Sequence, residues 1–294
     1  MGKNTVQGAE KRAFTRLFMD VCNWNNYWER WNDMLWMFAT SIANVVDLEN
    51  REEREKIYRQ IAGKYSAEEM TRFSELFKEM VNEYERKPFQ DFLGSIYMEL
   101  DMGSDAHGQF FTPYNVCAMM AHLEIDKDLI EEMIRRRGWI SVNDCASGAG
   151  ALLVAAAERL KEIGINYQEH CLFVAQDLDS TVAMMCYIQL SMLGCPGYVR
   201  IGDTLTEPPV YDLLLGDPGS KIWRTPMYYS SVWTGRRLCR ILDSIMQSGR
   251  KVPEKPKAEP PAAESPKPKA PAKPRKEDKP NDDGERTIQL SIFQ

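Results

Sequence analysis

Four short hydrophobic segments between residues 138 and 217 constrain the fold of this chain most strongly. They read WISVNDCA, HCLFVAQDL, YVRIGDTL and YDLLLGDP, and each ends in an acidic residue or a turn. Segments with a helical pattern, near residues 150–164 and 179–193, separate the first three. Strands that alternate with helices predict βαβ units and a parallel sheet. Because ligands bind at the carboxyl ends of strands in such sheets, the polar residues at these ends are candidates for a binding site.

Residues 10–104 carry a helical pattern instead. In SAEEMTRFSELFKEMVNEYER, Ser66 and Glu69 form a capping box in front of hydrophobic residues at helical spacing, which predicts an amphipathic helix. Upstream, WNNYWERWNDMLWMF concentrates aromatic residues, among them Trp24, Trp28 and Trp31. So many rings are compatible with a base-stacking surface, but charges that alternate onto the other face favour a helix packed into a bundle.

The C-terminal part has the composition of a linker. From Pro253 to Arg286 the chain is rich in Pro, Ala, Lys and Glu and contains no aromatic residue. Such a segment cannot bury enough apolar area to offset its chain entropy, so we expect it to be disordered, with polyproline character. The predicted organisation is an α-helical N-terminal domain over 1–104, an α/β domain over 105–250, a disordered linker over 251–286 and a terminal peptide over 287–294.

Charge and hydropathy limit the partners of the chain. The net charge is −6, and from Arg250 to the end there are 11 Lys and Arg against 8 Asp and Glu. This C-terminal segment is therefore +3, which leaves about −9 for residues 1–249. An acidic body argues against a general phosphate-binding surface, so any contact with DNA must be local. We find no signal peptide and no apolar stretch of about 18 residues, which predicts a soluble cytoplasmic protein.

The seven cysteines lie singly in apolar surroundings, without CxxC pairs or histidines spaced to complete a zinc site. This pattern predicts reduced thiols in the core and no metal site. The residues are Cys22, Cys117, Cys145, Cys171, Cys186, Cys195 and Cys239.

The ends of the first three predicted strands carry residues suited to ligand binding. Asp144 ends the first strand, and the small residues of ASGAG follow before a helix. Small residues let the backbone approach a ligand, and a helix N-terminus offers N–H groups to an anion, although plain tight turns have the same pattern. Asp177 ends the second strand, where it could accept from ribose hydroxyls or cap a helix. Asp203 follows the third strand and could accept from an exocyclic amine.

The series GQFFTP, DCASGAG, AQDLD, IGDTL and LLGDPGS resembles the methylation subunits of type I restriction-modification systems and related N6-adenine DNA methyltransferases. It covers roughly residues 10–245. The resemblance implies a Rossmann-like core that binds S-adenosylmethionine, preceded by a helical domain. It also implies the cofactor-binding residues: Phe111, Thr112 and Pro113 over the methionine end, Asp144, Ser147, Gly148 and Gly150 at the methionine portion, Asp177 at the ribose and Asp203 at the adenine. Thr112 before Pro113 is equally suited to cap a helix.

The catalytic motif of this family is Asn or Asp, then Pro, Pro and an aromatic residue. The acidic or amide side chain and a backbone carbonyl accept from the amine of an extruded adenine, on which the aromatic ring stacks. Here Asp217 and Pro218 match, so the resemblance implies that they are catalytic, but Gly219 and Ser220 replace the second Pro and the ring. The ring of Trp223, three residues further on, is a candidate substitute.

The chain departs from the family a second time. Relatives continue with further strands and often a region that reads DNA sequence, whereas here one predicted helix over Val232–Gln247 and a connector precede the linker. The expected sheet is therefore truncated. Arg236, Arg237 and Arg240 form either a small cationic patch or the solvated face of this helix.

The last residues, TIQLSIFQ, form a hydrophobic segment after the linker. Gln289, Leu290, Ser291, Ile292 and Phe293 resemble the pentapeptide by which bacterial polymerases and repair proteins bind the replication sliding clamp. In an extended segment, the three apolar side chains can fill pockets while Gln289 hydrogen-bonds, and the linker acts as a tether. The alternative is a strand that folds back onto the sheet edge of the protein itself.

Two functions from different classes follow. The first is an S-adenosylmethionine-dependent adenine-N6 DNA methyltransferase of restriction-modification type, acting alone or with a specificity subunit, in which Asp217 accepts from the amine. The second is a catalytically inactive accessory protein, derived from a methyltransferase, that binds the sliding clamp or a modification complex. The ordered strand ends favour the first function, and Gly219 and Ser220 favour the second.

Overall fold

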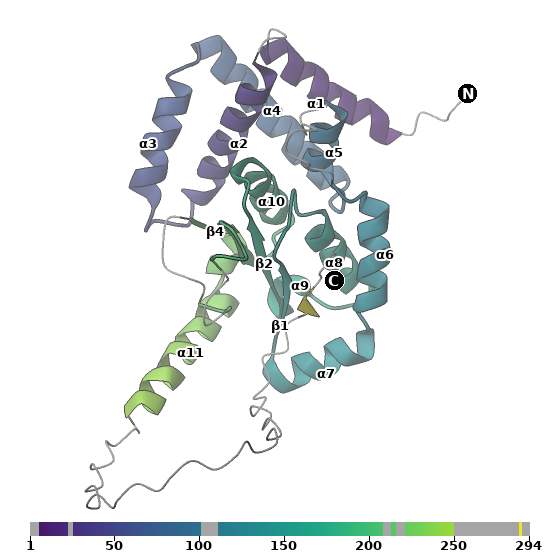
Figure 1. Ribbon diagram of the computed structural model, residues 1–294, viewed down its shortest axis with the longest axis vertical. Helices are drawn as coiled ribbons and strands as arrows, with labels where there is room; N and C mark the ends of the chain where they lie inside the picture. The colour runs from purple at the N-terminus through teal and green to yellow at the C-terminus, as the bar shows by residue number, and fades with distance from the viewer. Residues whose placement is uncertain are drawn as a thin grey trace, which may run out of the picture.

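The computed structural model describes residues 6–22, 26–100, 111–207, 213–215, 221–249 and 288–289. Its N-terminal half contains α1 (Val6–Cys22), α2 (Tyr27–Ala43), α3 (Arg51–Ala62), α4 (Ala67–Arg86), α5 (Phe92–Glu99), α6 (Tyr114–Glu124) and α7 (Lys127–Arg137). There follow β1 (Ile140–Asp144), α8 (Ala151–Glu162), α9 (Tyr167–His170), β2 (Cys171–Asp177), α10 (Ser180–Met192), β3 (Gly197–Ile201), β4 (Ile222–Arg224), a 3-10 helix η1 (Pro226–Tyr229), α11 (Ser231–Gly249) and β5 (Ile288–Gln289). In Figure 1, α1–α5 gather at one end of the sheet, and α11 extends away at the other.

The helical N-terminal part forms as the sequence predicts. At the start of α4, the Glu69 N–H donates to Ser66 Oγ at 3.2 Å and the Ser66 N–H donates to Glu69 Oε2 at 2.9 Å, which is the predicted capping box. In α2, Trp31 is fully buried, and its ring meets that of Phe18 edge-on at 5.2 Å. The bundle interpretation is therefore confirmed for Trp31, whereas Trp28 is 52% exposed.

Among the described residues, the strands form one sheet in the order β4-β3-β2-β1-β5. The first three predicted strands are present, and β1, β2 and β3 are parallel, as predicted. Strand β4 runs antiparallel to β3 and pairs Trp223 with Val199. The chain therefore has a mixed helical and sheet architecture with a small, mainly parallel sheet.

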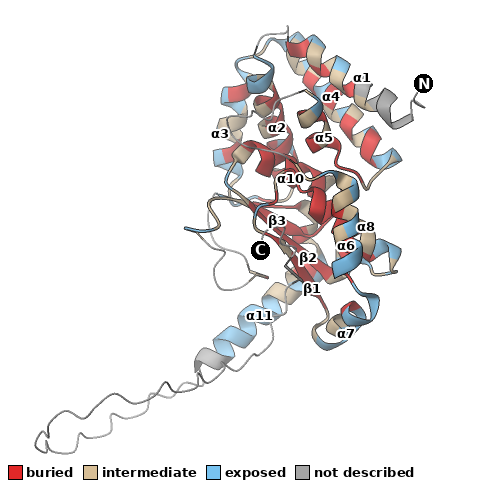
Figure 2. Ribbon diagram, turned by 45° about the vertical axis from the view of Figure 1, so that its right-hand side comes forward, coloured by how far each residue is buried: buried red, intermediate tan, exposed pale blue. Residues whose placement is uncertain are grey.

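Alternate residues of β2 separate two hydrophobic clusters, because successive side chains of a strand point to opposite faces. Phe173 and Ala175 join the large cluster, which continues through α8 and α10 into the N-terminal helices. Leu172 and Val174 join a smaller cluster with residues of η1 and the first turn of α11. Figure 2 shows the buried residues concentrated around the sheet and α10, while the outer turns of α11 are exposed.

The helix predicted over Val232–Gln247 is confirmed as α11, and its first turn is anchored to the body of the protein. Trp233 is fully buried, and its Nε1–H donates to the Gln168 carbonyl at 2.8 Å. Arg236 donates to the Gly138 carbonyl at 2.9 Å, and Arg237 donates to the Tyr228 carbonyl at 2.6 Å. Both guanidinium groups therefore hydrogen-bond to carbonyls of the protein itself. This argues against the predicted cationic patch, because two of its three arginines serve to anchor the helix.

The fourth predicted strand is wrong in the part that the structure describes, because residues 213–215 form a turn. The Leu214 and Leu215 carbonyls accept from the Tyr228 hydroxyl at 3.1 and 3.0 Å, so a side chain satisfies them. Leu214 is still buried, within the smaller cluster. The apolar run therefore predicts burial correctly at Leu214, and it predicts secondary structure incorrectly at residues 213–215.

Strand β5 brings the C-terminal segment to the sheet. Ile288 pairs with Val142 and Gln289 pairs with Asn143, in parallel, on the side of β1 away from β2. For Gln289 this pairing agrees with the fold-back alternative. The other four residues of the predicted clamp-binding peptide, 290–293, lie outside the described residues.

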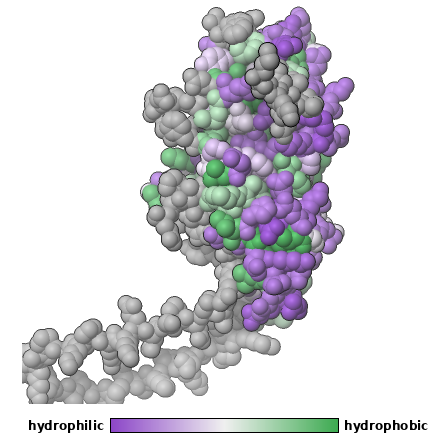
Figure 3. Space-filling model, turned by 90° about the vertical axis from the view of Figure 1, so that its right-hand side faces the viewer, coloured by the Kyte–Doolittle hydropathy of each residue, from purple (hydrophilic) through white to green (hydrophobic). Residues whose placement is uncertain are grey.

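Exposed hydrophobic side chains occur on the described surface, notably along α11 at Leu238, Leu242 and Ile245. Figure 3 shows the face that carries α6 and α7, where hydrophobic patches lie between hydrophilic side chains; Met119 and Leu123 of α6 are exposed. Five of the seven cysteines are buried free thiols, as predicted, whereas Cys145 is half-buried and Cys239 is exposed. Within the described parts of the chain, no helix is both long and apolar enough to cross a membrane.

Candidate functional site

The carboxyl ends of β1 and β2 form the floor of the candidate site. Asp144 is the last residue of β1 and pairs with Ala175, so β2 continues beyond it and ends at Asp177. Residues 145–150 form the turn that leads from β1 into α8. The first two strand-end acids therefore lie beside the glycine-containing turn, at the edge where ligands bind in parallel sheets.

Asp177 stabilises this turn through hydrogen bonds to backbone N–H groups. Its Oδ2 accepts from the Gly148 N–H at 2.7 Å, and its Oδ1 accepts from the Asp179 N–H at 3.0 Å. The N-cap of α10 is Asp179, whose carboxylate accepts from the Thr181 N–H at 2.7 Å. The helix-cap alternative for Asp177 is therefore wrong. Since a carboxylate offers about four lone-pair sites, Asp177 keeps acceptor capacity for a ligand hydroxyl.

Two glycines determine the backbone conformation of the turn. Gly148 and Gly150 have φ angles of +50° and +90°, in the left-handed region that other residues avoid. A Cβ at Gly150 would lie 2.7 Å from the Cys186 sulfur on α10. Position 150 must therefore remain glycine, which lets the N-terminus of α8 lie against α10 beside the pocket.

Asp144 is a buried carboxylate with a perturbed pKa. Its side chain is almost fully buried, and Oδ1 accepts from the Ala146 N–H at 3.2 Å. Burial raises the pKa of Asp144 to about 6, the charge of Asp177 adds to this, and the Ala146 hydrogen bond opposes it. Burial also raises the pKa of Asp177. A cationic group placed between these carboxylates would relieve the cost of their burial.

The segment Phe111–Pro113 covers the turn from the opposite side. The Phe111 ring stacks on the Tyr97 ring, with 5.6 Å between the ring centres. A Cβ added to Gly148 would lie 3.5 Å from the Phe111 ring, so the ring and the turn are in close contact. Helix α6 begins at Tyr114 with Pro113 at its N-cap position and no side-chain cap. Thr112 therefore does not cap the helix, and that alternative is wrong.

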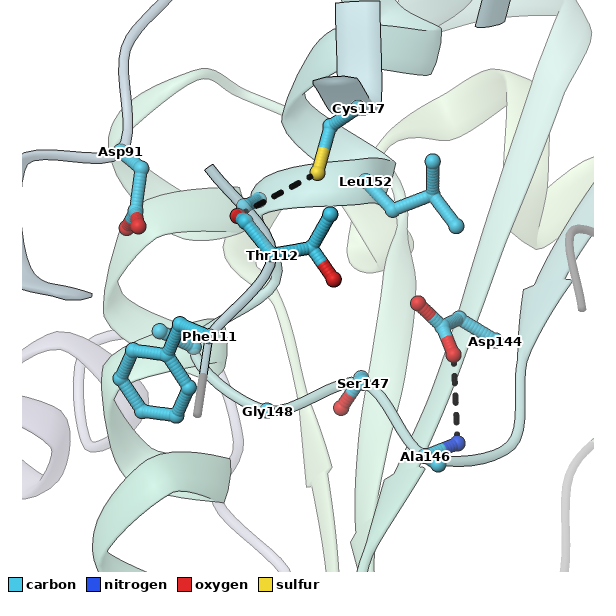
Figure 4. Close-up of a pocket in the computed structure, with 11 residues that line it drawn as sticks. Asp91, Phe111, Thr112, Cys117, Asp144, Ala146, Ser147, Gly148 and Leu152 are labelled. Carbon is cyan, nitrogen blue, oxygen red and sulfur yellow. Dashed lines mark hydrogen bonds between the residues drawn. The ribbon is translucent and has the colours of Figure 1, made fainter. Parts of the chain in front are cut away.

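These elements enclose a pocket of about 120 Å³. Figure 4 shows Thr112, Ser147 and the Asp144 carboxylate around the same space, with Phe111 at its side. A second cavity of about 530 Å³ shares Asp91, Phe111 and Thr112 and is also lined by Pro113. The inner pocket is smaller than the roughly 300 Å³ and more that a whole cofactor requires, so it suits one polar end of a ligand.

Sequence reasoning missed Asp91, which lines both cavities. Asp91 is buried and caps α5, where its Oδ1 accepts from the Gly94 N–H at 3.0 Å. Burial raises its pKa. An Asp before a hydrophobic helical run was the available signal, but such a residue is indistinguishable from an ordinary N-cap.

Gln189 of α10 joins Asp91 to the glycine turn. It is fully buried, and its Nε2 donates to the Ala149 carbonyl at 2.6 Å and to Asp91 Oδ1 at 3.0 Å. Its Oε1 accepts from the Tyr84 hydroxyl at 2.7 Å and from the Leu93 N–H at 3.2 Å. One side chain thus connects α4, α5, α10 and the turn.

Asp203 lies apart from the inner pocket. Its Oδ1 accepts from the Leu205 N–H at 2.9 Å, and this bond, with others from Thr206, lowers its pKa. Its loop nevertheless contacts the glycine turn, since the Thr204 hydroxyl donates to the Cys145 carbonyl at 2.6 Å. Five of the predicted residues therefore line one pocket: Phe111, Thr112, Asp144, Ser147 and Gly148. Asp177 contacts this pocket through its hydrogen bond with the Gly148 N–H, and Asp203 lies in a neighbouring loop.

The predicted catalytic residues, Asp217 and Pro218, lie outside the described residues, as do Gly219 and Ser220. Trp223, the candidate substitute for the missing ring, is only 3% exposed. Its ring packs edge-on against Trp36 and Tyr187, each at 5.5 Å, and the Arg54 guanidinium lies 4.6 Å from its centre. A buried ring cannot stack on a base, so this suggestion is wrong.

Comparison with protein families gives one match. Residues 90–252 match the model of the N-6 DNA methylase family. This match begins just before Asp91, contains every pocket residue described above and covers more than half of the chain. A search of curated proteins finds no significant match. The chain therefore belongs to the N-6 DNA methylase family.

Proposed function

We propose that this protein is an S-adenosylmethionine-dependent DNA methyltransferase that modifies the N6 of adenine and has a Rossmann-like core. The observation that carries the proposal is the pocket between Thr112, Asp144 and Ser147, which lies within the matched family region. Its buried carboxylate and small size suit the amino-acid end of the cofactor. The setting we propose is a restriction-modification type system in the cytoplasm.

The residues present fit this cofactor. Asp144 would accept from the ammonium group of the methionine portion, which offsets the cost of a buried carboxylate. The N-terminus of α8, after Gly150, offers N–H groups to the methionine carboxylate. Asp177 has acceptor sites left for ribose hydroxyls, and Asp203 is proposed for the adenine amine. When bound, the cofactor supplies an electrophilic methyl group.

The substrate end of the proposal rests on Asp217 and Pro218. The amine of an extruded adenine would donate to Asp217 and to a neighbouring carbonyl. Ser220 offers no ring for a stacking interaction worth about 1–3 kcal/mol per base. We therefore propose that a specificity or modification-complex subunit contributes to holding the DNA.

The test is transfer of labelled methyl groups from S-adenosylmethionine to DNA of varied sequence, by the full chain alone and with purified specificity subunits. We expect label in N6-methyladenine, and loss of at least about 100-fold of the rate in Asp217→Ala, the range for removing a group that acts on the reacting atoms. Asp243→Ala, an exposed acid on α11, is the matched control and should keep the parent rate. Cofactor binding without transfer under every condition would contradict the proposal. If the Gly219→Pro/Ser220→Tyr variant then gained activity, the loss of methyl transfer would be due to these two departures from the catalytic motif.

A second candidate function is that of an accessory protein that binds the sliding clamp, with or without methyl transfer. Gly219 and Ser220 favour it, and so does the hydrophobic peptide at the end of a long polar linker. A clamp-bound Gln289 could not also pair with Asn143. We therefore propose that clamp binding displaces β5 from the sheet.

Clamp binding should depend on the apolar residues of the peptide. We expect Leu290→Ala/Phe293→Ala to weaken binding of the full chain to purified clamp by at least about tenfold, since both side chains would leave apolar pockets. The linker variant Lys279→Ala should bind like the parent in the same surface plasmon resonance assay. Unchanged affinity of the double variant would refute docking through this peptide.

A further inference from the structure

The second cavity, next to the inner pocket, has no part in the proposed function. Its volume of about 530 Å³ lies within the range of about 300–1,000 Å³ that is typical of small-molecule sites. Its walls come from α1, the end of α4, α5, the segment Phe111–Pro113 and the start of α6. The cavity therefore lies where the N-terminal helices meet the segment that covers the glycine turn.

Lys11 of α1 brings a half-buried ammonium group to this cavity. Its Nζ donates to the Ser95 hydroxyl, which donates in turn to the Phe92 carbonyl at 3.0 Å. Because this partner is neutral, the hydrogen bond does not compensate the positive charge. An ammonium group has three N–H donors, so two remain for a ligand.

A second ammonium group, that of Lys87 at the C-cap of α4, lines the same cavity. Burial lowers the pKa of Lys11, the charge of Asp91 opposes this change, and the charge of Lys87 adds to it. Asp91 is the one acid among the described lining residues, and its Oδ1 already accepts from the Gly94 N–H and from Gln189 Nε2. The cavity therefore has an excess of positive charge, and a bound anion would offset the cost of burying it.

The wall also has an apolar part. The side chains of Met98, Phe111 and Pro113 line the same cavity as the two lysines. An aromatic ring and a flexible thioether suit an apolar ligand body. A phosphate monoester carries a charge of about −1.5 to −2 at pH 7, which matches two ammonium groups, and lysine is a common partner of phosphate.

We propose that this cavity binds a phosphate monoester with an apolar body, of the kind found in nucleotides and aryl phosphates. Lys11 and Lys87 bind the phosphate group, and the body lies against the apolar part of the wall. The cavity is a second ligand site, although it shares three lining residues with the inner pocket: Asp91, Phe111 and Thr112. Its ligand is independent of the proposed cofactor.

Isothermal titration of the full chain with phenyl phosphate tests the proposal, and inorganic phosphate and benzyl alcohol represent the two halves of this probe. We expect saturable binding of one phenyl phosphate per chain, with either half bound at least about tenfold more weakly because it loses the charged or the apolar contacts. Lys11→Met and Lys87→Met should each raise the Kd of phenyl phosphate about tenfold, since each removes a charge-assisted hydrogen bond. Lys78→Met, which changes an exposed lysine earlier in α4, is the matched control and should bind like the parent.

Lys11→Met also removes the hydrogen bond to Ser95 and can lower stability, so Lys87→Met provides an independent test. The inference would be overturned by a parent chain without saturable binding of phenyl phosphate, by equally tight binding of either half of the probe, or by a folded lysine variant that binds like the parent. Displacement of the bound ester by S-adenosylmethionine would also overturn it, because the ester would then occupy the cofactor pocket. A parent chain that binds phenyl phosphate but not S-adenosylmethionine would support this site and contradict the proposed function alone.

Discussion

Asp144→Asn is expected to stabilise the free protein at neutral pH and to weaken its binding of S-adenosylmethionine. Asparagine keeps an oxygen that can accept from the Ala146 N–H, but it removes a charge from an almost fully buried position. The pKa of this carboxyl is about 6, against an ordinary value of 3.8. At 1.36 kcal/mol per unit, the buried charge costs about 2–3 kcal/mol above pH 6.

The sign of the pH dependence follows from proton binding. Between pH 3.8 and about 6 the native state holds a proton on Asp144 that the unfolded chain releases. The free energy of unfolding therefore falls as pH rises through this window and levels off above it. The gain in the free energy of unfolding of Asp144→Asn over the parent should be about 2–3 kcal/mol at pH 7, and it should shrink toward zero as pH falls below 4.

Urea unfolding at several pH values, with cofactor titration at pH 7.5, checks both effects. Loss of a charge-assisted hydrogen bond to the cofactor ammonium should raise Kd about 10- to 100-fold. Asp243→Asn, which changes an exposed acid, should alter neither quantity. A variant that is less stable than the parent at pH 7, or that binds the cofactor equally well, would contradict the role given to Asp144.

Gln189→Leu is expected to destabilise the protein by about 3–5 kcal/mol. Leucine fills a similar volume but leaves four hydrogen-bonding groups without their partner: the Tyr84 hydroxyl, the Leu93 N–H, Asp91 and the Ala149 carbonyl. Each buried group left unsatisfied costs about 1–3 kcal/mol, and some of that cost is recovered by relaxation. The loss should appear as a lower urea midpoint with an unchanged slope.

Tyr84→Phe is the matched control, because it removes one of these four hydrogen bonds and keeps the ring. We expect it to cost about 1 kcal/mol. In the double variant the two effects should not add, because both single changes break the same bond. A Gln189→Leu variant within about 1 kcal/mol of the parent would show that this residue does not hold the turn in place.

The sequence predicts the part of the fold that depends on local patterns. The capping box before α4 and the alternation of helices with the first three strands need only neighbouring residues, and all of these are confirmed. Residues 213–215 differ because the Tyr228 hydroxyl, more than ten positions further along the chain, satisfies the carbonyls of Leu214 and Leu215. No local pattern carries that information.

The same distinction applies to the site. The order of motifs predicts which strand ends meet, and the pocket contains Asp144, Ser147 and Gly148 as expected. Asp91 escapes such reasoning because its burial depends on Gln189, almost a hundred positions away along the chain. The burial of Trp223 likewise comes from distant residues, Trp36 and Arg54 of the N-terminal helices, so the sequence near Trp223 does not reveal that its ring is inaccessible.

The central claim is that the strand-end pocket binds S-adenosylmethionine through Asp144 and Asp177. Calorimetric titration of the full chain with this cofactor tests it most directly. We predict saturable binding of one cofactor per chain, and binding weakened at least about tenfold in Asp177→Ala, which loses the bond to Gly148 as well as the proposed ribose contact. A well-folded parent chain that shows no saturable binding, or an Asp177→Ala variant that binds as tightly as the parent, would contradict the account.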